Sequence, residues 1–426
     1  MMHRFSWRII GILVLGSIGL SPAAWGKHDG LIHNGEQVLF PIGFYEHPKE
    51  VESLRRMAEA GVNLVHCNSQ EDLDRAASVG LMGVVPLPLQ NGATDQLRKT
   101  VSELRRHPAL AAWEGPDEIV WNFTAASMLH RTKGIHRESG EWWRQTENAM
   151  QYSQEQADQI IPAMREAVDM IRKLDQDNHP VWMNEALQSD VFYVRKYLDF
   201  VDIVGCDIYP VKKEDRRIHR MASATDRWIQ VGRGKPVWMV LQTFAWSELG
   251  EYYGVNETAY PTFQESRFMA YDVIAHGAKG VLYWGSAYLK SEKFRESIYA
   301  LTRELAQLQP FLTAEPEKNV VVRLIEIPEE GEITRGVKVQ VRRCGGDWLI
   351  ILVNEDDQFH MGVEVGGLGE LNGRQMELLY GEEQMLIQHG EMVTRMRPYE
   401  VKAFATGREW EAQNLQGRGF ISDSSD

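Results

Sequence analysis

Acidic and aromatic side chains follow several short apolar runs of this sequence, at positions where a strand would end. They are Trp113, Glu114, Asp117, Glu118, Asn184, Glu185, Asp207, Tyr209, Gln242, Thr243, Trp246, Trp284, Ser286 and Tyr288. Aromatic faces stack on the C–H faces of sugar rings, and carboxylates and amides hydrogen-bond sugar hydroxyls. These residue types therefore predict a lining suited to a carbohydrate.

A barrel of parallel strands would bring these side chains together. Between about residues 38 and 308, helical patterns alternate with eight β-rich runs: 38–44, 62–66, 82–86, 110–113, 181–183, 201–205, 237–241 and 281–284. Eight strand–helix units close an α/β fold of the (β/α)8 TIM-barrel type, whose strand ends form one active-site cup. Trp182 and Trp238 lie within their runs, so we expect them in the core.

The pattern changes after Pro310, where β-runs follow one another without helices between them. This predicts a small C-terminal antiparallel β-sandwich. The chain then divides into a signal peptide at 1–26, a TIM-barrel catalytic domain at 27–310, a β-sandwich domain at 311–408 and a polar, disordered tail at 409–426.

The first 26 residues have the pattern of a secretory signal. Arg4 and Arg8 precede an apolar run at 9–15, and the small residues Ala24 and Gly26 surround a cleavage point. The apolar run is too short for a full membrane span. We therefore expect a secreted or periplasmic protein without stable membrane insertion after the signal is removed.

Charge and motif content exclude several classes of function. The formal net charge is −14 and no basic stripe with interleaved aromatics is present, so we expect no nucleic-acid partner. The arginine pairs at 216–217 and 342–343 are typical of solvated faces. The three cysteines lie far apart in the sequence and make no disulfide framework.

The histidines and glycines show no pattern that would hold a cofactor. His66 and His276 stand alone, which is typical of packed, hydrogen-bonded histidines. The sequence has no zinc-ligand spacing, P-loop or dinucleotide fingerprint. We therefore expect neither a cofactor nor a metal.

Several segments resemble the clan-A glycoside hydrolases, particularly the β-galactosidase-like and agarase-like branches. The segment at 34–43 is similar to their opening strand, and 113–118 (Trp-Glu-Gly-Pro-Asp-Glu) resembles their fourth-strand segment, which ends in the acid/base glutamate. The segments at 265–271 and 276–284 resemble their final helix and strand. The resemblance implies hydrolysis of O-glycosidic bonds in a poly- or oligosaccharide, with Glu118 as general acid.

Two positions depart from the pattern of that clan. Asp117 stands where the clan has an asparagine that binds the sugar beside the cleaved bond, and Gln242 stands where it has the nucleophilic glutamate. A neutral amide cannot form a glycosyl ester at a useful rate, so another group must act. Asp207, ahead of Glu185, would be the opposing carboxylate, and an inverting mechanism through a water is one way in which it would act.

Other interpretations remain open from the sequence alone. Glu248 or Glu251 would reach the site from the loop beyond Trp246, or the barrel would bind glycan without cutting it. A lyase with Tyr209 as base is a further alternative, and Glu118 and Asp207 also suit helix or turn capping. In the hydrolase interpretation, the sugar subsites would be formed by Trp113, Asp117, Asn184, Tyr209, Gln242, Trp246 and Trp284.

Overall fold

A closed barrel of eight parallel strands forms the first part of the protein. The computed structural model describes residues 28–125, 134–135, 141–250, 253–326 and 335–413, so the expected signal peptide and most of the expected tail lie outside the described residues. The barrel strands, in order around the barrel, are β10 (Gly280–Trp284), β3 (Ile42–Phe44), β4 (Leu64–His66), β5 (Met82–Pro86), β6 (Leu110–Glu114), β7 (Val181–Ala186), β8 (Ile203–Asp207) and β9 (Val237–Gln242). The predicted TIM barrel is confirmed.

The first predicted strand, 38–44, is divided into two elements. Its first half belongs to β2 (Gln37–Leu39), which forms an antiparallel hairpin with β1 (Ile32–Asn34), and only β3 enters the barrel. Pro41 separates the two because it has no N–H to donate to a sheet ladder. The hairpin closes the lower end of the barrel, where the Gly30 carbonyl accepts a hydrogen bond from Trp238.

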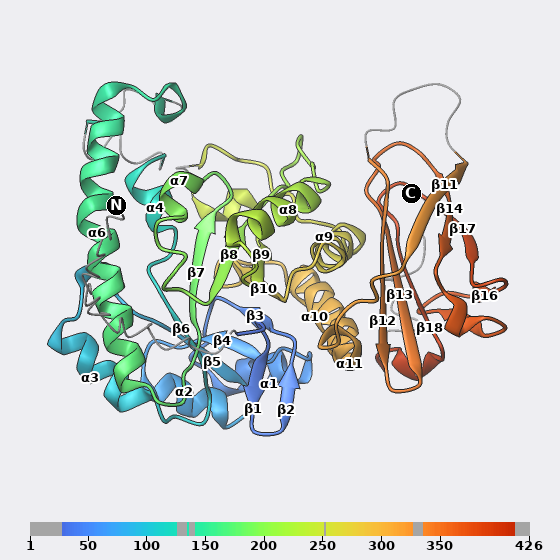
Figure 1. Ribbon diagram of the computed structural model, residues 1–426, viewed down its shortest axis with the longest axis horizontal. Coiled ribbons are helices and arrows are strands. Elements are labelled where there is room, and N and C mark those ends of the chain that lie inside the picture. Colours follow the sequence, from blue (N-terminus) through green and yellow to red (C-terminus); the bar gives the residue numbers. More distant parts are fainter. Residues whose placement is uncertain (1–27, 126–133, 136–140, 251–252, 327–334, 414–426) are drawn as a thin grey trace, which may run out of the picture.

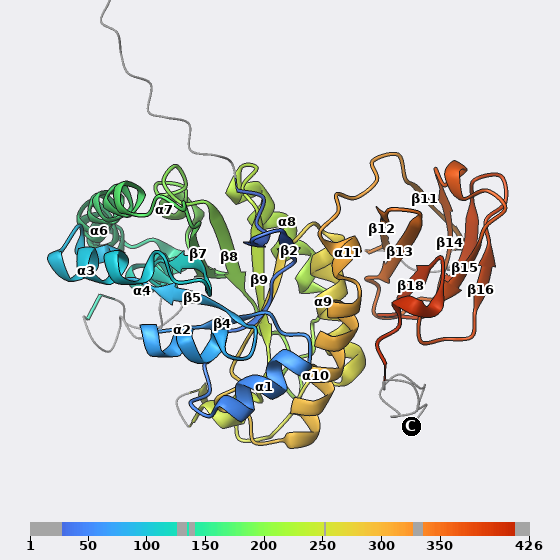
Figure 2. The ribbon, with the colours of Figure 1, turned by 90° about the horizontal axis from the view of Figure 1, so that it is seen from below.

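Helices surround the strands (Figures 1 and 2). They are α1 (Val51–Glu59), α2 (Gln70–Ala77), α3 (Asp95–Leu104), α4 (Ile119–Phe123), α6 (Glu147–Leu174), α7 (Val191–Val194), α8 (Arg220–Gly232), α9 (Phe263–Ala275), α10 (Glu292–Gln307) and α11 (Gln309–Leu312). Side-chain caps start several of them. In α9, Thr262 accepts from the Glu265 amide while Glu265 accepts from the Thr262 amide, which satisfies two unpaired donors. None of the helices in the described part is long and apolar enough to cross a membrane.

Two tryptophans fill the centre of the barrel. Trp182 and Trp238 are buried, as the sequence predicted, and their ring centroids lie 5.1 Å apart. Glycines make room for them: a Cβ at Gly205 would lie 2.5 Å from Trp182 Nε1, and one at Gly280 would lie 2.6 Å from a Trp238 ring carbon. The barrel is therefore closed at mid-height, and a ligand can enter only the cup above the two rings.

The C-terminal part is an antiparallel β-sandwich, as predicted. One sheet has the order β11 (Val321–Glu326), β14 (Met361–Gly366), β17 (Met392–Met396), and the other has the order β12 (Val337–Cys344), β13 (Asp347–Asn354), β18 (Val401–Ala405), β15 (Gln375–Leu378), β16 (Gln384–Leu386). The two sheets enclose a core that includes Ile350, Val363 and Phe404.

The sandwich lies against α9, α10 and α11 of the barrel (Figure 1). Arg342 of β12 is buried and donates to the carbonyls of Phe311 and Leu312 at the end of α11. The sequence-based interpretation of Arg342 as part of a solvated face is therefore wrong. The strand alternates its side chains between two faces, so Arg342 points at the barrel while Arg343 points to solvent.

Candidate active site

An open cavity of about 440 Å³ lies at the carboxyl ends of the barrel strands. Its lining includes Tyr45, Asp117, Glu118, Trp121, Asn184, Asp207, Tyr209, Arg220, Trp246, Tyr253 and Trp284. Seven of the residues expected at the site therefore meet here: Asp117, Glu118, Asn184, Asp207, Tyr209, Trp246 and Trp284. Trp113, Glu185 and Gln242 do not line the cavity.

Glu118 and Asp207 are hydrogen-bonded to each other. Asp207 is the last residue of β8 and shares the inward face of the strand with Gly205. Glu118 starts α4 with a left-handed backbone at φ 48° and ψ 37°, which is strained for a residue with a side chain. That conformation turns the chain back over the cavity directly after Asp117.

The environment favours a shared proton on this pair. Burial raises the pKa of Asp207 well above its usual range, and the neighbouring Glu118 raises it further, while a hydrogen bond from Tyr209 opposes the shift. Burial also raises the pKa of Glu118. Two carboxyl groups in contact cannot both ionise easily, so the pair retains one proton where free carboxylates would have none.

Asp117 opens onto the same cavity beside the pair. Its Oδ1 accepts a hydrogen bond of 3.0 Å from Asn184 Nδ2, and the Tyr45 hydroxyl lies 3.5 Å away. The side chain of Asp117 faces the open cup, but protein atoms surround much of its carboxylate. This desolvation raises the pKa of Asp117 to about 7, and the charges of Glu114 and Glu118 contribute in the same direction. Asp117 is therefore positioned to accept hydrogen bonds from a ligand hydroxyl.

Below the cavity, His66 is hydrogen-bonded to the buried carboxylate of Glu114. Burial lowers the pKa of His66, but Glu114 outweighs this effect and leaves it raised. The ring also lies against Tyr45, at 5.4 Å between centroids. The expectation that His66 is a packed, hydrogen-bonded histidine is consistent with this position.

Aromatic rings form another part of the cavity wall, beside the carboxyl pair. Tyr209 stacks on Trp284 at 5.4 Å between centroids, and Trp246 contacts Tyr253 at 5.3 Å. The indole N–H of Trp246 is buried and has no hydrogen-bond partner among the described residues. A wall of rings beside carboxylates is suited to a sugar, whose faces are apolar and whose edges carry hydroxyls.

Glu185 points away from the cavity. Its oxygens accept hydrogen bonds from the amides of Val120 and Trp121 and from the hydroxyls of Ser189 and Tyr197. The carboxyl group is fully buried, and burial raises its pKa to about 8. Asn184 and Glu185 are neighbours on a strand, so when Asn184 faces the cup Glu185 must face the helices. It therefore anchors the start of α4 to β7.

Gln242 is at the expected place on β9 but is covered. Its Oε1 accepts from the Val211 amide at 2.9 Å, and its Nε2 donates to the carbonyls of Val211 and Phe244 at 2.9 and 3.0 Å. Both polar atoms are thus used to hold the loop after β8 against β9. Glu248 is similarly occupied, by Ala245, Tyr260 and Lys290, and Glu251 lies outside the described residues.

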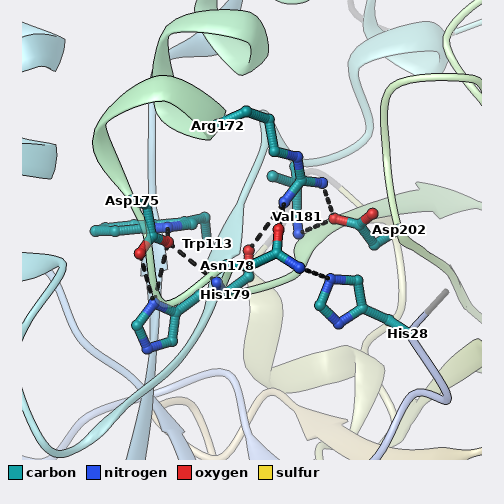
Figure 3. A network of polar contacts seen from close by, with 8 residues as sticks. All are labelled: His28, Trp113, Arg172, Asp175, Asn178, His179, Val181 and Asp202. Atoms are coloured by element: carbon teal, nitrogen blue, oxygen red, sulfur yellow. Dashed lines mark hydrogen bonds and ion pairs between the residues drawn. The ribbon is translucent and has the colours of Figure 1, made fainter. Parts of the chain in front are cut away.

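Trp113 also lies behind the barrel wall, which corrects its expected place in a sugar subsite. Its indole nitrogen donates to Asp175 at 2.8 Å, and Asp175 is hydrogen-bonded to His179 as well (Figure 3). This network joins the end of α6 to the start of β7, where Arg172 also pairs with Asp202. The alternating face of β6 places Glu114, not Trp113, toward the barrel interior.

Sequence reasoning missed several cavity residues, among them Tyr45, Trp121, Arg220 and Tyr253. Tyr45 directly follows β3, so its position after a strand end was a usable signal. Trp121, Arg220 and Tyr253 come from helices and loops over the cup, where strand periodicity gives no information.

Comparisons with known proteins agree with this architecture. The glycoside hydrolase family 42 model, described as β-galactosidase, matches residues 140–311, which include β7 to β10. A β-galactosidase from Bacillus circulans sp. alkalophilus is similar over 86% of this chain and 99% of its own, with 9% identity and a TM-score of 0.52. A glycoside hydrolase family 5 protein from Bacteroides vulgatus is similar over 88% and 90%, with 12% identity and a TM-score of 0.50.

A third structure is only partly covered. The chain is similar to a β-galactosidase from the psychrophilic Marinomonas ef1 over 63% of its own length and spans 60% of that enzyme, with 15% identity and a TM-score of 0.44. None of the curated proteins matches the sequence. The family-model match and the closed parallel barrel confirm the resemblance to clan-A glycoside hydrolases, and glycoside hydrolase is the enzyme class that they support.

Proposed function

We propose that this protein is an exported glycoside hydrolase that cleaves O-glycosidic bonds in a poly- or oligosaccharide by general acid/base catalysis. The observation that carries the proposal is the contact between the carboxyl groups of Glu118 and Asp207, which lie with a group of aromatic rings in the lining of one open cavity. A glycosidase needs a carboxyl group that remains protonated near neutral pH, together with a carboxylate to assist water or the sugar cation.

The contact between Glu118 and Asp207 describes the resting enzyme. Glycosidases hold their two carboxyl groups about 5 to 9.5 Å apart when the substrate lies between them. A sugar seated against Tyr209 and Trp284 replaces the hydrogen bond within the pair. With the sugar bound, Glu118 takes the proton that the pair shares, and the hydrogen bond from Tyr209 favours the charged form of Asp207 against the effect of burial.

Cleavage then uses the protonated form of Glu118 and the ionised form of Asp207. Glu118 gives its proton to the leaving oxygen while the bond to the anomeric carbon breaks, and water adds to that carbon and loses a proton to Asp207. Asp117, oriented by Asn184, accepts a hydrogen bond from a neighbouring hydroxyl. Water addition and proton return leave both carboxyl groups as they began.

The test is hydrolysis of a panel of oligosaccharides and polysaccharides by the wild type and by Glu118→Gln. Loss of general acid catalysis typically slows hydrolysis by about 10²- to 10⁴-fold. Glu166→Gln, on the exposed face of α6, is the matched control and should retain full activity. An active wild type together with an equally active Glu118→Gln would refute the assignment.

A non-catalytic glycan-binding protein is the second candidate, favoured by one observation. The position of the clan's nucleophile holds Gln242, and both of its polar atoms are bound to backbone. In that case calorimetry would show binding of an oligosaccharide that the protein does not cleave, and Trp284→Ala would weaken it. Turnover of any glycan by the wild type would exclude this alternative.

Export is the remaining part of the proposal, and it is supported by the sequence of residues 1–26. Expression of the full chain in a bacterium and sequencing of the N-terminus of the product tests it. A mature chain starting near Lys27 in the periplasm or medium is expected, and an intact N-terminus on a protein retained in the cytoplasm would contradict export.

A further inference from the structure

Four ionisable side chains meet at the boundary between the barrel and the β-sandwich, outside the cavity. Asp226 lies on α8, Asp272 and His276 lie at successive turns of α9, and Glu355 follows β13 of the sandwich. The ligand atoms of Asp272, His276 and Glu355 all lie within 4.8 Å of one another. Two separate elements of the fold, the end of α9 and the segment after β13, thus direct donor atoms at one point.

The contacts of His276 show which of its two ring nitrogens must carry a proton. Its Nδ1 lies 2.8 Å from an oxygen of Asp226, which can only accept, so Nδ1 carries a proton. Its Nε2 lies 2.8 Å from Oε1 of Glu355 and 3.8 Å from Oδ1 of Asp272. A neutral imidazole would therefore direct its Nε2 lone pair at two carboxylates, so the arrangement needs either a proton on Nε2 or a metal ion between the three groups.

Asp272 provides an independent indication of a missing partner. Its side chain has no exposed surface, and neither of its oxygens accepts a hydrogen bond of ordinary geometry among the described residues. The Ala222 backbone N–H interacts with the carboxyl group outside that geometry, and the like charges of Glu355 and Asp226 lie nearby. A buried carboxylate with so few donors around it is stabilised by a bound cation.

We propose that Asp272, His276 and Glu355 bind a divalent transition-metal ion that joins the β-sandwich to α9. Asp226 orients the His276 ring, as carboxylates commonly do for metal-binding histidines. Bonds of about 2.0 to 2.2 Å place neighbouring ligand atoms of a tetrahedral zinc site roughly 3.3 Å apart. The distances of 2.8 and 3.8 Å from Nε2 bracket that value.

The donor set indicates which ions fit. One imidazole nitrogen and two carboxylates suit Zn²⁺, with water completing the shell, whereas Ca²⁺ takes about six to eight oxygens. The ligands come from residues 272, 276 and 355. Only the pair four residues apart on α9 is local in sequence, which explains why spacing gave no metal motif.

The experiment titrates Zn²⁺ into the full-length protein after treatment with a chelator, and follows binding by calorimetry and the Tm by scanning fluorimetry. We expect one Zn²⁺ per chain and a rise in Tm of a few degrees at saturation, because a ligand that binds only the folded state stabilises it. Ca²⁺ at the same concentration should leave the Tm unchanged.

Glu355→Gln and His276→Asn should remove both the binding and the rise in Tm. His219→Asn is the matched control, because His219 also joins the barrel to the sandwich, through the Tyr399 hydroxyl at 2.9 Å, but does not belong to the cluster. It should retain the full response to Zn²⁺. Glu355→Gln keeps the shape of the side chain, so it remains informative if His276→Asn does not fold.

Three results would overturn the proposal. The first is a wild type that shows no change of Tm with Zn²⁺, which would leave His276 as an imidazolium held by three carboxylates. The second is a Glu355→Gln variant that responds as the wild type does, which would place the bound ion elsewhere. The third is an equal response to Ca²⁺, which would contradict the donor set.

Discussion

At the scale of single residues, the contact between Glu118 and Asp207 sets the pH range of the proposed reaction. The pKa of each carboxyl group is raised, first by burial, and that of Asp207 also by the charge of Glu118. The active form keeps one proton on the pair, so activity should decline at alkaline pH when that proton is lost.

Asp207→Asn tests this coupling. The variant should lose about 10²- to 10⁴-fold in kcat, because no carboxylate receives the proton of water. The residual activity should decline at a lower pH than that of the wild type, because loss of the last proton from the site no longer places two negative charges in contact. Profiles of kcat/KM against pH measure both effects, and an unchanged alkaline decline would show that the two groups titrate independently.

Glu185 is expected to stabilise the fold and to take no part in the reaction. Glu185→Gln should retain wild-type kcat and KM, whereas Glu185→Ala should lower the free energy of unfolding by roughly 2–5 kcal/mol, because several buried donors lose their acceptor. Urea denaturation and kinetics on the same glycan distinguish the two roles. A large loss of kcat in a fully folded Glu185→Gln would restore Glu185 as a catalytic candidate.

The raised pKa of Glu185 also makes the free energy of unfolding depend on pH. The carboxyl group has a pKa near 4.5 in the unfolded chain and about 8 in the folded one. Its contribution to stability is fully present below about pH 4.5 and is lost as the pH rises through 8, because the folded state holds a proton that the unfolded state releases. Glu185→Gln should remove this dependence, so its stability relative to wild type should increase from pH 5 to pH 9.

At the scale of elements, β9 and the loop after β8 depend on Gln242. Gln242→Glu would restore the residue type of the clan's nucleophile. It would also direct a carboxylate at the carbonyls of Val211 and Phe244, which now accept from the amide. We expect a loss of roughly 2–4 kcal/mol in unfolding free energy and no gain in hydrolysis. A faster enzyme would show that the position is a nucleophile site after all.

The strands also show what could be predicted from the sequence. Apolar runs separated by helical patterns located the eight barrel strands to within a few residues, and the strand ends brought Glu118, Asp207 and Trp284 to one cavity. The predictions that Trp113 and Glu185 belong to the site were wrong for one reason. Each predicted strand ended one or more residues early, and a shift of one residue reverses the face of a side chain. The prediction that Gln242 lines a sugar subsite was wrong for a different reason. A loop covers the end of its strand, and no periodic pattern in the sequence indicates such a loop.

At the scale of the whole molecule, the barrel and the sandwich are joined by buried polar contacts. Arg267 of α9 is paired with the buried Glu304 and donates to the Val401 carbonyl of β18. Arg342 of β12 donates to Gln340 and to the last carbonyls of α11, and burial lowers its pKa to about 10. The clustered charges of Asp272, His276 and Glu355 lie on the same boundary, so the sandwich contributes to the stability of the barrel.

Arg342→Met tests how strongly the two parts unfold together. The variant keeps an unbranched apolar stem but removes the guanidinium, which leaves buried carbonyls of α11 without donors, so we expect a loss of roughly 3–5 kcal/mol. Calorimetry should show one unfolding transition in the wild type and a separate, earlier one for the sandwich in the variant. Arg343→Met removes only exposed contacts, namely the ion pair with Glu370, a hydrogen bond to the Gly345 carbonyl and a contact with the Trp348 ring. It should change stability by about 0.5 kcal/mol or less. Equal effects of the two substitutions would mean that the buried contacts at the end of α11 do not join the domains.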